Sequence, residues 1–171
     1  MAGALIGVNH DSGIGRRGDD GKPRPHSGDR LMAAQIAPPV GFARHYRQSP
    51  VTDPWEPLYS RKDGGAVSIG FQAAAAHANS RGFVHGGLIS ALADNAMGLS
   101  CGETLGDVTG LVTVSLAVDF LGSANLGQWV EITPKVNRAG GRLCFAEAMV
   151  TADGEPCAKA HATFSVSLKS G

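Results

Sequence analysis

The sequence predicts a single α+β domain in which one long apolar helix packs on a curled antiparallel sheet. Residues 85–101 form an apolar segment that is too long for a typical strand and predicts a helix. Residues 110–168 are divided by glycine-bearing turns and alternate between apolar and polar positions, which predicts strands. With 171 residues, of which 43% are hydrophobic and 18% charged, the chain is long and apolar enough for one such core.

Two predicted strands precede the helix. Leu58–Arg61 and Ala66–Phe71 flank a turn over 62–65 and predict a hairpin. An alanine-rich link over Ala73–Ala78 follows, and the helix is expected from His85 to Cys101, ending near Gly102.

Four strands are predicted after the helix, each able to pair with the next as an antiparallel meander. Their ranges are Gly110–Leu121, Trp129–Asn137, Leu143–Thr151 and Pro156–Leu168. In the first of them, alternation predicts that one face carries Val112, Val114, Leu116, Val118 and Phe120. Pro134 indicates an edge position or a bulge, because proline has no N–H to donate.

The N-terminal part of the chain differs in composition from the rest. Residues 1–48 hold seven basic and four acidic residues, and seven of the nine prolines lie at or before Pro57. We expect residues 1–35 to be a disordered leader, because they show no apolar periodicity that would offset the ordering entropy. Residues 36–57 are expected to form a proline-rich N-terminal arm with a short helix around Phe42–Gln48, and residues 58–171 the folded domain.

Charge and cysteine content exclude several classes of protein. Fifteen basic and fifteen acidic residues give no net charge, which disfavours a nucleic-acid partner bound through its phosphates. Cys101, Cys144 and Cys157 show no C-x-x-C spacing, so we expect buried structural thiols rather than a disulfide framework, a zinc site or a nucleophile. The six histidines show no metal-ligand spacing, so no metal site is expected. No apolar run predicts a membrane span or a signal peptide, so the expected location is cytoplasmic.

Asp94 is the only ionisable residue in the apolar segment Leu88–Leu99. A helix that is apolar nearly all round is a buried helix. A carboxylate there costs free energy unless it has hydrogen-bond partners or takes part in a reaction. Asp94 is therefore a candidate catalytic group, and a structural aspartate bonded to a backbone amide is the alternative.

The predicted helix begins in a glycine-rich turn, where His85 precedes Gly86 and Gly87. The first N–H groups of a helix have no intrahelical partner and favour negative charge. Such groups can stabilise the oxyanion formed in acyl transfer. The alternative is that the paired glycines only make a tight turn.

The spacing of these two features has a consequence for assembly. Gly86 and Asp94 are eight residues apart, or about 12 Å along a helix axis. A reacting carbonyl must lie roughly 3 Å from both the oxyanion donors and the attacking group. If the two features form one site, they therefore come from two subunits, which predicts a homodimer with two equivalent sites.

These residues resemble the hotdog-fold acyl-CoA thioesterases of the phenylacetate-pathway, PaaI-like group. The pattern is N-x-x-G-x-x-H-G-G, running from Asn79 to Gly87, followed by Asp94 eight residues after the first glycine of the pair. The resemblance covers about residues 50–168 and includes the segments 84–98, 113–116 and 119–121, Gly154, and the strand that ends in Thr163 and Phe164.

The resemblance implies that residues 58–171 are a hotdog thioesterase domain with a long helix wrapped by a five- or six-stranded sheet. It implies homodimers joined edge to edge, commonly paired again into tetramers, and hydrolysis of an aryl- or fatty-acyl-CoA without a cofactor. By position, Asp94 would be the nucleophile or the general base. The Gly86 amide would polarise the thioester carbonyl, helped by Asn79 or His85, and Thr113 would position the water or the carboxylate.

The phosphates of CoA need cations, and four residues are candidates: Arg81, Lys135, Arg138 and Arg142. A solvated charged turn is the alternative for the arginines that flank Gly140 and Gly141.

Two other functions stay open. A non-catalytic hotdog module would bind acyl-CoA or lipid, but a pure binder gains nothing from a buried acid. A hotdog enoyl-CoA hydratase or dehydratase would pair His85 with Asp94 on the acyl β-carbon. Hydrolysis frees a thiol and hydration does not, so the products separate these reactions.

Overall fold

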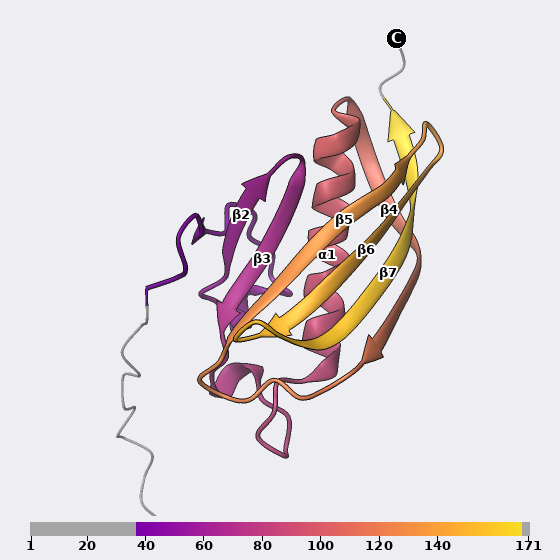
Figure 1. Cartoon of the computed structure of the whole chain (residues 1–171). Helices are drawn as coiled ribbons and strands as arrows, with labels where there is room; N and C mark the ends of the chain where they lie inside the picture. The colour runs from indigo at the N-terminus through magenta and orange to yellow at the C-terminus, as the bar shows by residue number, and fades with distance from the viewer. Residues whose placement is uncertain (1–36, 169–171) are drawn as a thin grey trace, which may run out of the picture. The chain divides into compact units, whose positions relative to one another are not determined.

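The structure is a computed structural model that describes residues 37–168, so the predicted leader over 1–35 lies outside the described residues. One helix, α1, packs against an antiparallel seven-stranded sheet with the order β1-β2-β3-β5-β6-β7-β4 (Figure 1). The α+β class with one main helix is confirmed. The elements are β1 (Ala43–Arg44), η1 (Asp53–Trp55), β2 (Tyr59–Asp63), β3 (Ala66–Gln72), η2 (Ala75–His77), α1 (Gly86–Leu105), β4 (Val108–Phe120), β5 (Trp129–Ala139), β6 (Leu143–Ala152) and β7 (Glu155–Leu168).

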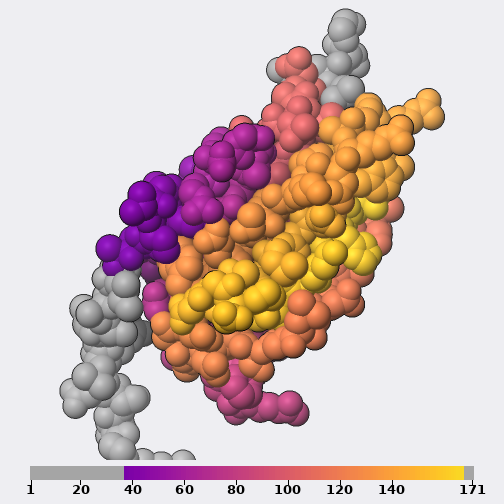
Figure 2. Space-filling model, in the orientation of Figure 1, coloured from indigo at the N-terminus to yellow at the C-terminus, as the bar shows by residue number. Residues whose placement is uncertain are grey.

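The core lies between α1 and the inner face of the sheet. Leu92, Ala93, Ala96 and Met97 of α1 are completely buried. The inner face of β7 carries small residues as predicted, with buried alanines at 158, 160 and 162. Seen from the sheet side, β5, β6 and β7 hide most of the helix (Figure 2). None of the helices within residues 37–168 is long and apolar enough to cross a membrane.

The helix predicted around Phe42–Gln48 is wrong. The chain is extended there, and Ala43 pairs with Ser60 across β1 and β2. Phe42 is buried with its ring edge-on to that of Trp129, at 5.2 Å between centroids. Tertiary packing of this one aromatic ring holds the segment against the sheet and overrides its local helical propensity.

The predicted end of α1 is also too early. The helix runs through Gly102 to Leu105 and is capped by Gly106, whose φ of 74° ends the helical path. A glycine inside a helix weakens it by about 1 kcal/mol without breaking it, which explains why Gly102 is not the end.

The meander predicted after the helix is correct only for β5, β6 and β7. The first strand of the set, β4, pairs with β7 instead of β5 and forms the edge of the sheet, whereas β5 pairs with β3. Residues 121–128 carry the chain between these two places (Figure 1). Pro134 of β5 lies beyond the pairing with β3, which stops at Ile132, so its missing N–H disrupts no ladder there.

The uniform alternation predicted for β4 is interrupted by a β-bulge. The pairing of β4 with β7 shifts register between Thr113 and Ser115. Leu111 packs on the core before the bulge, and Leu116 and Val118 do so after it, so the buried positions change from odd to even numbers. Val112 and Val114, expected on the buried face, are 67% and 62% exposed. A bulge inserts one unpaired residue, and it therefore inverts which side chains face the helix.

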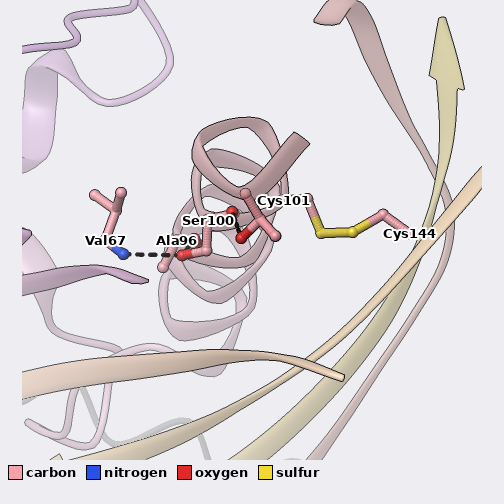
Figure 3. Close-up of a disulfide and its surroundings, with 6 residues drawn as sticks. Val67, Ala96, Ser100, Cys101 and Cys144 are labelled. Atoms are coloured by element: carbon pink, nitrogen blue, oxygen red, sulfur yellow. Dashed lines mark hydrogen bonds between the residues drawn. A yellow bond between two sulfur atoms is a disulfide. The ribbon is translucent and has the colours of Figure 1, made fainter. Parts of the chain in front are cut away.

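Two of the three predicted thiols form a disulfide. Cys101 of α1 and Cys144 of β6 are fully buried and joined, with 6.3 Å between their Cα atoms (Figure 3). The neighbouring Ser100 hydroxyl accepts a hydrogen bond from the Val67 N–H at 2.9 Å and donates to the Ala96 carbonyl at 2.8 Å. The two cysteines are 43 positions apart in the sequence, so no local motif indicates that they pair. Cys157 is a buried thiol, as expected, and burial raises its pKa.

Candidate active site

Asp94 and Thr113 form the centre of the candidate site. Asp94 lies half-buried in the middle of α1, and the Thr113 hydroxyl of β4 donates a hydrogen bond of 2.8 Å to its Oδ1. The β4 bulge makes this contact possible, because it places Thr113 on the same side as Leu111, facing the helix. The second carboxylate oxygen, Oδ2, has no hydrogen-bond partner among residues 37–168, which leaves it able to accept a proton or attack a carbon.

This pair borders a cavity of about 470 Å³ between α1 and β4. Its volume falls within the range of about 300–1,000 Å³ typical of small-molecule sites. Most of its wall comes from the successive α1 positions 94, 95, 98, 99, 102 and 103 and from β4 residues between Val108 and Thr113. The sequence analysis missed Tyr46 and Arg47, which reach this cavity from the N-terminal arm. No local pattern in the arm indicates that contact.

The N-terminus of α1 presents a free backbone donor. His85 is the N-cap residue, and its Nδ1 accepts a hydrogen bond of 2.9 Å from the Gly87 N–H. The Gly86 N–H has no partner among the described residues. A Cβ at Gly86 would lie 2.9 Å from Cζ of Phe120, so the absence of a side chain lets the end of β4 close over this turn.

Asn79 holds the loop that leads into α1. Its Oδ1 accepts hydrogen bonds from the Arg81 N–H at 2.8 Å and from the Phe83 N–H at 3.3 Å. Its own N–H donates to the Phe83 carbonyl at 2.7 Å. The amide oxygen of Asn79 is therefore occupied in shaping the loop.

The four predicted CoA cations do not lie in one cluster. Arg138 and Arg142 line the same open hollow at the hairpin between β5 and β6. Lys135 lies on β5 with its Nζ 3.7 Å from Glu147. Arg81 is exposed in the loop before α1. The structure thus brings together the two arginines that flank Gly140 and Gly141.

The other histidines have structural surroundings. The Nδ1 of His77 accepts from the Ala74 N–H at 2.9 Å, its Nε2 lies 2.9 Å from the Trp55 carbonyl, and burial lowers its pKa. His45 is buried, without a hydrogen-bond partner for its ring among the described residues, and burial lowers its pKa as well. His161 is exposed on β7. No cluster of three His, Cys, Asp or Glu side chains within residues 37–168 has the arrangement of a metal site.

A single long helix wrapped by an antiparallel sheet is the architecture of the hotdog fold. The sequence profile described as Thioesterase superfamily matches residues 81–159. The Pseudomonas aeruginosa protein PA0474, whose name classes it as an esterase, is 33% identical over 127 residues, covering 74% of this chain and 95% of that protein. The chain therefore belongs to the thioesterase superfamily.

Solved structures show the same fold. A Streptococcus mutans protein, determined bound to acetyl CoA, is 25% identical with a TM-score of 0.63, over 74% of this chain and 98% of that one. A variant of the phenylacetic acid degradation protein PaaI from Thermus thermophilus is 22% identical with a TM-score of 0.61, over 68% of this chain and 98% of that one. The predicted resemblance to PaaI-like hotdog thioesterases is confirmed.

Proposed function

We propose that this protein is an acyl-CoA thioesterase that hydrolyses an aryl- or fatty-acyl-CoA to the free acid and CoA. The observation that carries the proposal is the Asp94 carboxylate, which is held by Thr113 at 2.8 Å on the wall of a cavity. The CoA-bound state of the Streptococcus mutans relative supports CoA as the leaving group.

In the proposed reaction, a water oxygen ends on the acyl carbon and the carbon–sulfur bond breaks. Asp94 either removes a proton from the attacking water or attacks the carbonyl itself, giving an anhydride that water then opens. The CoA sulfur leaves as thiolate and takes up a proton. A thioester is already activated, so a carboxylate and an oxyanion hole suffice without a catalytic triad.

The oxyanion donor is the Gly86 N–H of the partner subunit. Within one chain, Gly86 and Asp94 are about 12 Å apart along α1, which is too far for both to reach one carbonyl.

The edge of the sheet supports a homodimer, because β4 is a 13-residue strand with a second edge that pairs with no other strand of residues 37–168. Four apolar side chains at this edge are strongly exposed: Val112, Val114, Phe120 and Leu121. An unpaired edge of this kind can form hydrogen bonds with another strand, and we propose that this strand comes from a second copy of the chain. Two such dimers would then pair into a tetramer.

Arg138 and Arg142 are the cations that we propose for the CoA phosphates, because they share one hollow and neither forms an ion pair with residues 37–168. Arg81 and Lys135 are secondary candidates, the latter already engaged with Glu147. His85 would help Gly86 with its remaining ring nitrogen, because Nδ1 is occupied by Gly87.

The test is release of free thiol from phenylacetyl-, benzoyl-, acetyl- and long-chain fatty acyl-CoA by the wild-type protein, Asp94→Asn and a control, Asp63→Asn. Asparagine keeps an oxygen for the Thr113 hydroxyl but cannot act as a base, so we expect turnover to fall about 10²- to 10⁴-fold. Asp63 is the exposed last residue of β2, so its variant should match the wild type. Full turnover by Asp94→Asn would refute the assignment. Tight acyl-CoA binding without thiol release would identify a binding module, and a hydrated product without thiol would identify a hydratase.

The shared site is tested by mixing two inactive variants. Gly86→Pro removes the N–H at the first helical position, where proline is tolerated, and His85 already has the extended ψ of 129° that a residue before proline requires. The Cβ of proline would meet the ring of Phe120 at 2.9 Å, and this ring is exposed and free to move aside. Mixing with Asp94→Asn creates dimers that hold one intact site, and equal mixing should restore roughly a quarter of wild-type activity. No recovery, with subunit exchange demonstrated separately, would contradict a site built from two chains.

A further inference from the structure

We propose that Gly98 and Gly102 set the length of the acyl chain that the protein accepts. The acyl chain of the substrate would extend from Asp94 along the face of α1 that lines the cavity, toward Tyr46 and Arg47. The inference rests on the proposed thioesterase function. It goes further because it assigns the α1–β4 cavity to the acyl group and names the residues that limit the length of that group.

The first support is the direction of the cavity. It starts at Asp94 and Thr113, where the thioester carbonyl would lie, and continues past Gly98 and Gly102 to the end of the helix. These two glycines lie one and two turns beyond Asp94, at about 6 and 12 Å along the axis. A cavity that leads away from the reacting carbon for this distance fits an extended acyl chain.

The second support is the chemistry of the walls. Leu99, Leu111 and Phe164 line the cavity between its two ends, together with the polar residues Asn95, Glu103 and Thr109. Apolar surface buried here favours a hydrocarbon chain by about 25 cal/mol per Å². The three side chains therefore give an acyl chain apolar contacts along one part of the wall.

The far end of the cavity is held by an ion pair. Lys62 Nζ lies 2.6 Å from Oε1 of Glu103, and the same ammonium group lies 4.8 Å from the centre of the Tyr46 ring. The hydrogen bond to Glu103 raises the pKa of Lys62. Tyr46 is thereby held beside the last turn of α1, and Arg47 beside it takes part in no ion pair among the described residues. A polar boundary of this kind limits how far an apolar chain extends.

The two glycines offer a direct way to shorten the cavity. A Cβ at Gly102 would meet Leu111 Cδ1 at 3.6 Å, and a Cβ at Gly98 would meet Phe164 Cε1 at 3.4 Å, both ordinary contacts. Replacing glycine inside a helix also raises helix propensity. A methyl group is therefore accommodated at both positions, and a larger side chain would extend from them into the cavity.

The experiment measures kcat/KM of Gly98→Leu, Gly102→Leu and the milder Gly102→Ala on acetyl-, hexanoyl-, decanoyl- and palmitoyl-CoA. One methylene group in an apolar pocket already changes discrimination by tenfold or more. We expect Gly102→Leu to lower the decanoyl-to-acetyl ratio at least tenfold and to spare the hexanoyl-to-acetyl ratio, and Gly98→Leu to lower both. Gly102→Ala should lower the decanoyl-to-acetyl ratio by a smaller factor. Asp107→Leu is the control, because Asp107 is an exposed residue just after α1 that lies outside this cavity.

Equal losses on all four substrates in Gly102→Leu would show that the cavity holds the common CoA part and would overturn the proposal. Unchanged ratios in both leucine variants would overturn it as well. Dissociation constants of the same acyl-CoAs, measured with Asp94→Asn added to each variant, separate this inference from the proposed function. Chain-length-dependent binding without turnover in the wild type would refute hydrolysis and keep the acyl cavity.

Discussion

The hydrogen bond from Thr113 to Asp94 should contribute about tenfold to catalysis, and Thr113→Val measures it. Valine keeps the shape of threonine and removes only the hydroxyl, so the change deletes the bond of 2.8 Å and little else. A hydrogen bond to a charged group contributes about 1.5–3 kcal/mol. Thr113 is exposed, which places the expected value near 1.5 kcal/mol, or about a tenfold loss of kcat/KM.

The assay is thiol release from the best acyl-CoA of the panel, and it includes Thr113→Ser, Asp94→Asn and the double variant. Because Thr113 acts by positioning Asp94, serine should restore most of the lost rate. For the same reason, Thr113→Val should have little further effect once Asp94 is asparagine. Thr163→Val is the control, since it makes the same substitution on neighbouring β7 at a side chain without a hydrogen bond within residues 37–168. A serine variant as slow as the valine variant, or full additivity of the two losses, would refute the positioning role.

Two further predictions concern stability. The Cys101–Cys144 disulfide closes a loop across 43 residues, so its reduction should lower the free energy of unfolding by about 4 kcal/mol in guanidinium titrations. The denatured but unreduced chain should show one reactive thiol, Cys157, and three thiols would contradict the bond. Burial lowers the pKa of His45 and of His77, so both stay neutral in the fold while the unfolded chain binds protons below about pH 6.5. The free energy of unfolding should therefore fall as the pH drops through that value, by up to about 1.4 kcal/mol per pH unit for each histidine. If His45→Phe left the pH dependence of the unfolding free energy unchanged, His45 would not contribute to it.

Local periodicity was sufficient to predict the helix, the carboxylate of Asp94 within it and the glycine turn at its start. Asp94 is identified by being the one charge in an apolar segment, and Gly86 by its place at the start of that segment. Both signals are short-range, because the side chains concerned lie on one element. The inner face of β7 is predicted equally well, since its alternation is uninterrupted from Ala158 to Phe164.

What the sequence did not reveal depends on contacts between distant segments. The disulfide joins residues 43 positions apart, and the edge position of β4 depends on pairing with the last strand of the chain. The short arm strand depends on Phe42 packing against Trp129. Each of these is decided by tertiary packing, which the pattern of one segment does not encode.

The β4 bulge explains how an edge strand brings Thr113 to Asp94 of the helix. With strict alternation, a strand that directs Leu116 and Val118 inward would direct Thr113 away from the helix. The register shift between Thr113 and Ser115 lets the same strand pack its later residues on the core while Thr113 faces Asp94. It also leaves Val112 and Val114 exposed, at the edge where we place the second subunit. The irregularity in β4 therefore serves the carboxylate and the proposed dimer together, and a regular strand would lose one of them.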